Sequence, residues 1–214
     1  MKKPFKDNSN LNVMKKIFVI IYCLACSLCI SAQSLREIWI EMPDSIIPYL
    51  TKSQRTELVD YIKMNVTPVV KNTFGDSTFI KRMTKDYLKV LLNKNTQLEI
   101  KILDPSSFAL VETWNGPVAE SKLRVYDYQW NVRKITLPET FSVQQPDTMS
   151  NSTYADLCSI MTPRLQELHF SDMDNFLLVD YNFPLLSKED VKRVRMLLKP
   201  SRLIWTGKVF RYEK

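Results

Sequence analysis

The side chains that most often carry out catalysis are scarce in this sequence. His169 is the only histidine among the 214 residues. A metal site built from several histidines is therefore excluded, and a serine or cysteine nucleophile has one candidate histidine base. Cys158 is the only cysteine beyond residue 32, and neither residue stands in a signature of a nucleophile family. We expect Cys158 to be a small core residue and His169 to be a strand residue with a hydrogen-bonded ring.

Motifs for cofactors and metals are missing as well. Gly75, Gly116 and Gly207 are the only glycines, which is too few for a phosphate loop or a dinucleotide fingerprint. Residues 172–175 resemble the start of a calcium loop but lack its glycine and its distal glutamate, so a hairpin turn is favoured. We predict no catalytic residues, no metal site and no cofactor. A pair of catalytic carboxylates stays open, because the separation of such groups is spatial.

One group of aromatic residues suggests binding. Tyr126, Tyr128 and Trp130 recur at period two and could share a sheet face, with Trp114 at the neighbouring turn. Such a face can stack on sugars or peptides. The alternative is that these four residues form one packed face of the sheet.

The elements that position these residues begin with a capped helix, predicted from about Lys52 to Met64. Thr51 is its expected N-cap, and Gln54 completes a capping box. Pro68 prevents the helix from continuing. The apolar stripe at helical spacing comprises Leu58, Tyr61 and Ile62.

A second helix near the C-terminus repeats this pattern. Residues 184–198 align without a gap with residues 48–62, and Ser187 takes the capping position of Thr51. Two independent capped helices would explain the echo, and so would an internal duplication. A duplication requires both apolar stripes to lie against antiparallel sheet.

Most of the remaining chain is predicted to be antiparallel sheet. Short turns separate the segments, which favours a meander and an α+β fold. In residues 97–103, Leu98 and Ile100 lie on one face, and Glu99 and Lys101 on the other. The predicted strands are 78–83, 87–92, 97–103, 108–114, 122–128, a hairpin of 165–170 and 176–182, and a last strand of 203–212 interrupted by Gly207. Residues 137–152 are polar and aperiodic and predict a long loop, followed by a short helix at 153–161.

The N-terminus is predicted to be an export signal. Met14-Lys15-Lys16 is basic, residues 17–30 are apolar, and Ala32 precedes a plausible cleavage site. Residues 1–13 add nothing to such a signal, which suggests Met14 as the true start. A lipoprotein signal and an uncleaved anchor are the alternatives.

Cleavage would leave residues 33–214 as a single α+β domain. Removing residues 1–32 leaves 25 basic and 22 acidic residues, a net charge of +3. No basic patch then calls for nucleic acid. Cys158 would have no partner for an intrachain disulfide, and no stable membrane span would remain.

Several segments of the sequence match the pattern of one known family. They are Trp39, Met42-Pro43-Asp44-Ser45, Pro48-Tyr49-Leu50-Thr51, Gln54-Arg55, Val59-Asp60-Tyr61, Thr84-Lys85-Asp86-Tyr87-Leu88-Lys89-Val90 and Pro184-Leu185-Leu186-Ser187-Lys188-Glu189. Through them the sequence resembles an uncharacterised family of small secreted proteins from Bacteroides-type Gram-negative bacteria, whose domain is of unknown function. The first block, residues 39–61, carries most of the resemblance, and an export signal that ends in Ser31-Ala32-Gln33 is similar to those of the group. The resemblance implies a periplasmic or secreted location and no particular chemistry.

The same resemblance implies a modification. Secreted proteins of this bacterial group can be O-glycosylated where aspartate is followed by serine or threonine and then a small or aliphatic residue. The chain beyond residue 32 offers Ser45, Ser77 and Thr148, with Thr148 expected to be the most exposed. The alternative is plain turn chemistry, since these dipeptides suit turns.

The function expected from these observations is binding. We predict a non-enzymatic periplasmic or secreted module whose partner, a protein or a glycan of the cell envelope, the sequence does not identify. A carboxylate-based hydrolase and a structural subunit of an envelope assembly are the alternatives. A deep polar cleft would favour the enzyme, and a broad apolar patch would favour the assembly.

Overall fold

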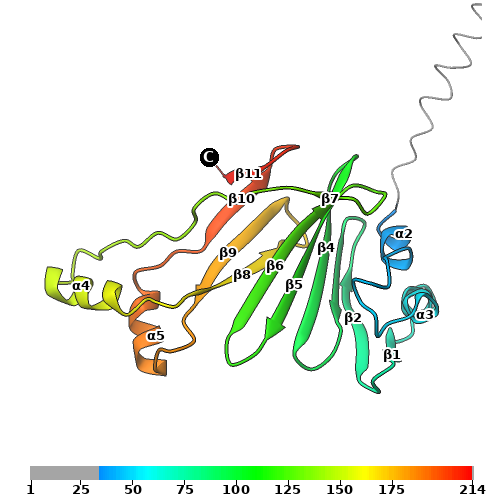
Figure 1. The fold of residues 1–214 in the computed structure, drawn as a ribbon, viewed down its shortest axis with the longest axis horizontal. Coiled ribbons are helices and arrows are strands. Elements are labelled where there is room, and N and C mark those ends of the chain that lie inside the picture. Colours follow the sequence, from blue (N-terminus) through cyan, green and yellow to red (C-terminus); the bar gives the residue numbers. More distant parts are fainter. Residues whose placement is uncertain (1–33, 214) are drawn as a thin grey trace, which may run out of the picture. The chain divides into compact units, whose positions relative to one another are not determined.

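The fold was obtained as a computed structural model that describes residues 34–213. Residues 33–214 form one compact unit. The predicted signal peptide lies outside the described residues. This unit contains four helices and two antiparallel sheets within the described range, which confirms the α+β prediction (Figure 1).

The first sheet is a seven-stranded antiparallel meander in sequence order. Each strand follows its neighbour through a short connection, as the turn signals predicted, and five of the strands match predicted segments within a few residues. The edge strands β1 and β7 were not predicted, because they have only 3 and 2 residues and carry no periodicity. The strands are β1 (Val69–Lys71), β2 (Ser77–Met83), β3 (Tyr87–Leu91), β4 (Thr96–Asp104), β5 (Ser107–Asn115), β6 (Ala119–Tyr126) and β7 (Val132–Arg133).

Helices α2 (Leu35–Ile40) and α3 (Lys52–Lys63) cover one face of this sheet and form its first core. The capping box of Thr51 and Gln54 on α3 is confirmed. Helix α2 was not predicted, although Ser34 and Glu37 form a second capping box there. The helices pack through buried residues that include Trp39 and Leu58, against Leu88, Ile100 and Leu110 of the sheet.

The second sheet has four strands in the order β11-β10-β9-β8. Its hairpin of β8 (Leu165–Phe170) and β9 (Phe176–Asn182) has the predicted bounds. The prediction of one interrupted strand over residues 203–212 is wrong. The chain reverses at Gly207, which has a φ of +89°, and makes a hairpin of β10 (Ser201–Trp205) and β11 (Phe210–Tyr212).

Strand β8 is an edge strand, and its free edge lies on the open face of the first sheet. The Leu168 N–H donates to Ser121 Oγ on β6 at 3.0 Å, and the Phe170 N–H donates to Glu99 Oε2 on β4 at 2.9 Å. Side chains therefore satisfy the backbone groups that an edge strand exposes. A second core closes beside this contact, from Tyr87, Ala109, Val111 and Val125 of the first sheet and Leu168, Phe170, Leu177, Val179, Leu203 and Phe210 of the second.

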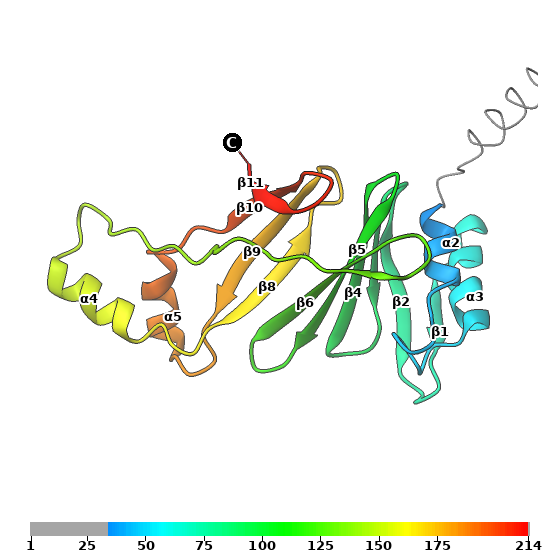
Figure 2. The same ribbon diagram turned by 45° about the horizontal axis from the view of Figure 1, so that its top comes forward.

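The chain between the two sheets is the predicted long loop. In Figure 2 it runs from β7 past the second sheet to α4 (Asn151–Ser159). Two contacts fasten the loop: Ser201 Oγ donates to the Thr140 carbonyl oxygen at 3.1 Å, and the Gln144 N–H donates to the Leu197 carbonyl oxygen at 2.9 Å.

Helix α5 (Lys188–Arg195) joins β9 to β10 and does not repeat the setting of α3. Ser187 caps it as predicted, with its Oγ accepting from the Asp190 N–H at 3.1 Å. Its stripe residues Val194 and Leu197, however, pack in a third core with α4 and Phe183, and not in the first or the second core. The duplication hypothesis is therefore wrong, and the echo reflects shared capping chemistry.

Candidate functional site

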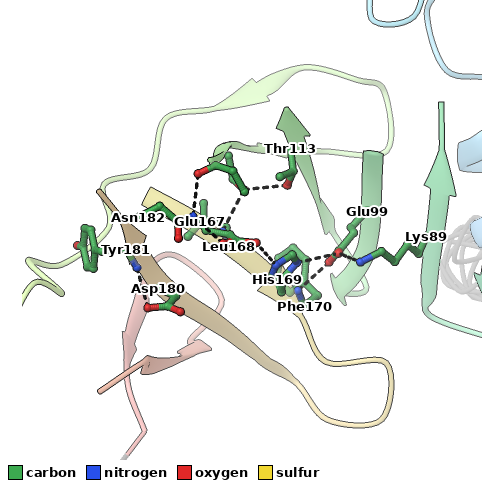
Figure 3. A network of polar contacts seen from close by, with 12 residues as sticks. Lys89, Glu99, Thr113, Glu167, Leu168, His169, Phe170, Asp180, Tyr181 and Asn182 are labelled. Atoms are coloured by element: carbon green, nitrogen blue, oxygen red, sulfur yellow. Dashed lines mark hydrogen bonds and ion pairs between the residues drawn. The ribbon is translucent and has the colours of Figure 1, made fainter. Parts of the chain in front are cut away.

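The polar centre of the molecule is His169, whose ring lies between two carboxylates (Figure 3). Nδ1 lies 3.2 Å from Glu99 Oε1, and Nε2 lies 2.8 Å from Glu167 Oε1. Lys89 Nζ donates to the same Glu99 oxygen at 2.9 Å. We call Lys89, Glu99, His169 and Glu167 the His169 network.

Strand geometry brings this network together. Side chains alternate across a strand, so Lys89 on β3 and Glu99 on β4 share one face, where they are paired in register. The same rule places Glu167 and His169 on one side of β8. The edge of β8 docks on the open face of the first sheet, and this contact places His169 next to Glu99, whose side chain is fully buried.

The charges of the network are mutually compensated. Hydrogen bonds to Glu167 and Glu99 raise the pKa of His169 to about 9, so the ring is an imidazolium at neutral pH. Burial pushes the pKa of Glu99 upward, but hydrogen bonds from His169 and Lys89 hold it below its usual value. The hydrogen bond from His169 also lowers the pKa of Glu167, so both carboxylates are ionised.

Further polar groups extend the network toward α5. Asn182 Nδ2 donates to Glu167 Oε2 at 2.7 Å, and Arg195 Nη2 donates to Asn182 Oδ1 at 2.8 Å. Arg195 Nη1 lies 2.6 Å from both carboxylate oxygens of Asp180. A continuous chain of hydrogen bonds therefore runs from β3 of the first sheet to α5.

An open cleft of about 490 Å³ lies beside the network. A β-bulge at Lys81 shapes one wall, because Ile80 pairs with Val90 while Arg82 already pairs with Lys89. Two residues then oppose one, and both Lys81 and Arg82 line the cleft. We call this surface the basic cleft; its lining residues are Lys81, Arg82, Tyr87, Lys89, Phe170, Ser171 and Asp172.

A buried lysine, Lys101, fixes the turn that forms the other wall. Lys101 is only 1% exposed, and its Nζ lies 2.8 Å from Asp86 Oδ2 and 3.2 Å from the Ser171 carbonyl oxygen. Asp172 of the same turn pairs with Arg82 at 3.1 Å. The hairpin turn predicted over residues 172–175 is thus present and is bound to the first sheet.

The four aromatic residues predicted to bind ligands do not lie together. Tyr126 is 4% exposed and packs with Trp130 against Phe108, with ring centroids 5.2 Å and 4.8 Å apart for Tyr126–Trp130 and Phe108–Trp130. Tyr128 borders the same core. Trp114 lies at the opposite end of β5 and is 51% exposed. The structure thus leaves Trp114 as the accessible member of the set.

The other predicted residues have simple surroundings. Cys158 lies in α4 and borders the third core, while His169 has both ring nitrogens at carboxylates. The three serine and threonine residues proposed for glycosylation, Ser45, Ser77 and Thr148, are all exposed. Within residues 34–213, no group of three or more His, Cys, Asp or Glu residues is arranged to hold a metal ion. No helix of that same range is long and apolar enough to cross a membrane.

The sequence alone did not identify Glu99, Glu167 or the basic cleft. Alternation correctly placed Glu99 and Lys101 on one face, but nothing in β4 shows that the edge of β8, some 70 residues later, covers that face. The one local signal was the Glu167–His169 spacing of two residues within a predicted strand, which puts both side chains on one side.

Comparison with known proteins agrees with this architecture. The structure is similar to that of a domain of an uncharacterised protein from Porphyromonas gingivalis W83, with a TM-score of 0.65 and 19% identity, covering 84% of this chain and 97% of that chain. At that identity the similarity shows the fold alone. No curated protein matches the chain. The sequence profile of a family described as "Protein of unknown function (DUF3256)" matches residues 27–210. The predicted kinship with an uncharacterised family is thereby confirmed: the chain belongs to the DUF3256 family, whose function is unknown.

Proposed function

We propose that the protein is a non-enzymatic binding module that works in the periplasm or outside the cell and holds its ligand at the basic cleft. One observation carries this proposal: the only histidine is enclosed by two carboxylates, one at each ring nitrogen. A general base needs a free lone pair at the operating pH, and an imidazolium with a pKa near 9 has none at neutral pH.

The same geometry argues against the carboxylate-based hydrolase. The His169 ring lies between Glu99 and Glu167 and contacts both, so it occupies the space between the two carboxylates where a substrate or a water would have to sit. Their lowered pKa values also keep both groups ionised, whereas a catalytic pair needs one protonated acid. The network therefore suits the fixing of two sheets better than proton transfer.

Accessible positive groups make the basic cleft the favoured binding surface. Lys81 and Arg82 are both exposed, and the cleft is open to solvent with a volume in the range of small-ligand sites. The fixed Ser171 turn gives the cleft a rigid wall, and the His169 network supports the cleft from behind, which lowers the ordering cost of binding. An envelope glycan or protein is the partner class that the export signal makes available.

Export and binding are tested separately. In the native host, the full chain should fractionate with the periplasm or medium as a species that begins at Gln33; a species retaining the apolar run would contradict export. For binding, the mature protein purified from that host is titrated with envelope glycan and protein fractions while its amide NMR spectrum is recorded. Shifts confined to the basic cleft, with ligand recovered chemically unchanged, support a binding module. Conversion of the ligand would contradict it.

A further inference from the structure

The charges around the basic cleft do not balance. Lys89 is compensated by Glu99 at 2.9 Å, and Arg82 is compensated by Asp172 at 3.1 Å. Lys81 has no acidic group within 4.0 Å among residues 34–213. With His169 charged, the His169 network is neutral, so the cleft keeps one uncompensated positive charge at its mouth.

The bulge is the reason for that charge. In a regular strand one residue of β2 would oppose Lys89, and its neighbours would point to the other face. The extra residue instead directs both Lys81 and Arg82 to the cleft, above Lys89. Three basic side chains thus converge on one space, although like charges repel, and a bulge of this kind is a frequent device beside functional sites.

The lining also limits what the rest of a ligand can be. The apolar floor is almost closed to solvent, since Tyr87 is 4% exposed and Phe170 6% exposed. A hydrophobic ligand would therefore find little surface to cover. Asp172, whose Oδ2 pairs with Arg82, has its second carboxylate oxygen at the rim, where it can accept hydrogen bonds from hydroxyl groups.

We propose that the basic cleft binds the carboxylate of a small hydroxylated ligand, that is, an acidic sugar of the uronic acid type. This inference rests on the proposed binding function and names its ligand class. Lys81 supplies the uncompensated charge, and the Arg82 guanidinium, whose Nε faces Asp172, offers its two Nη groups to the carboxylate. The second carboxylate oxygen of Asp172 accepts from sugar hydroxyls. One net positive charge matches one carboxylate, and a volume of about 490 Å³ admits one or two sugar rings.

The test uses the mature protein purified after expression of the full chain. Its amide NMR spectrum is recorded during titration with D-galacturonate, with neutral D-galactose and with D-galactose 1-phosphate. The expected result is a saturable shift at Lys81, Arg82 and Ser171 with galacturonate, at least about tenfold weaker with galactose, and weakened by added salt. The variant Lys81→Gln should bind galacturonate about five- to tenfold more weakly.

A matched variant separates local from global charge. Lys63 is exposed at the end of α3, which covers the opposite face of the first sheet, so Lys63→Gln removes the same charge and should leave the affinity unchanged. Equal binding of galactose at the cleft would overturn the carboxylate inference and leave the binding module standing. Tighter binding of galactose 1-phosphate than of galacturonate would overturn the inference that the ligand carries a single negative charge. No shift in the cleft with any of the three sugars would overturn the inference, whereas the proposed function is judged by the envelope fractions.

Discussion

Nε2 of His169 lies 2.8 Å from Oε1 of Glu167, two residues earlier on the same strand. With the buried carboxylate of Glu99 at the other ring nitrogen, this contact turns the one histidine into a fixed positive charge between two sheets. Its consequences for stability and binding can each be measured.

The first prediction concerns pH. The folded-state pKa of His169 is raised to about 9 from an unfolded value near 6.5, so its contribution is fully present below pH 6.5 and is lost as the pH rises through 9. The pKa values of Glu99 and Glu167 are lowered in the folded state. Their contribution to stability is therefore present above the pKa of a free glutamate and is lost as the pH falls through their folded-state pKa values. Urea denaturation should therefore show greatest stability between about pH 5 and 6.5.

His169→Gln isolates the alkaline part of this curve. The loss between pH 6.5 and 9 should be on the order of 2 kcal/mol, less than the full shift implies because the ring is partly exposed. In the variant that slope should disappear, whereas Lys208→Gln should retain it. An unchanged slope in His169→Gln would assign the pH dependence to other groups.

The second prediction is that Glu99→Gln destabilises the protein by about 3 kcal/mol, since it leaves two buried or half-buried cations without their carboxylate. Glu120→Gln, at an exposed position of β6, is the matched control and should change the free energy of unfolding by less than about 0.5 kcal/mol. Thermal and urea unfolding measure both. Equal stability of the two variants would show that the network contributes nothing.

The third prediction concerns the helical layer. Arg55 is 1% exposed and donates to the carbonyl oxygens of Leu50 and Met42 at 2.6 Å each, and to Asp44 at 3.0 Å. Lysine cannot reproduce this planar set of donors. Arg55→Lys should cost about 3 kcal/mol, which corresponds to a fall in Tm of roughly 6–12 °C for a domain of this size. Arg211→Lys, at an exposed position, should leave the Tm unchanged, and an equal effect at both positions would refute the role of Arg55.

Much of the fold followed from local patterns. The alternation in β4, the turn between β8 and β9, and the N-caps Thr51 and Ser187 are local features, so they could be predicted. Helix α2 was not predicted because it has only 6 residues, which is fewer than a periodic pattern needs. The β10–β11 hairpin was not predicted because one glycine can either interrupt a strand or reverse the chain. Only the positive φ of Gly207, which the structure gives, distinguishes the two.

The candidate site depended on long-range packing. Glu99 and Phe170 are 71 residues apart, and the contact between them exists only because an edge strand docks on a sheet face. No local period carries that information. The aromatic set shows a second limit of local patterns. Tyr126 and Trp130 pack together, but Trp130 lies in the turn after β6, and period-two spacing does not distinguish a binding face from a core.

The fourth prediction is that the exported protein carries O-linked glycan in its native host. The motivating triplets place their hydroxyl residues, Ser45, Ser77 and Thr148, at exposed positions. Of these, Ser77 already accepts a hydrogen bond from Lys71 at 3.0 Å, and Thr148 lies in the long loop, so Thr148 is favoured. Intact-mass spectrometry should show an increment that Thr148→Ala reduces and that Thr153→Ala does not. A mass equal to that of the unmodified chain would contradict the predicted glycosylation.

The most direct test of the account is the titration of His169 itself. Because it is the only histidine, selective ¹³C labelling gives one ring signal to follow by NMR across pH 5 to 10.5. The structure predicts a midpoint near 9 and an imidazolium at neutral pH, with the midpoint moving down in Glu99→Gln. A midpoint at or below 6.5 in the folded protein would contradict the His169 network. The ring would then be neutral at neutral pH, and His169 would again be a candidate general base.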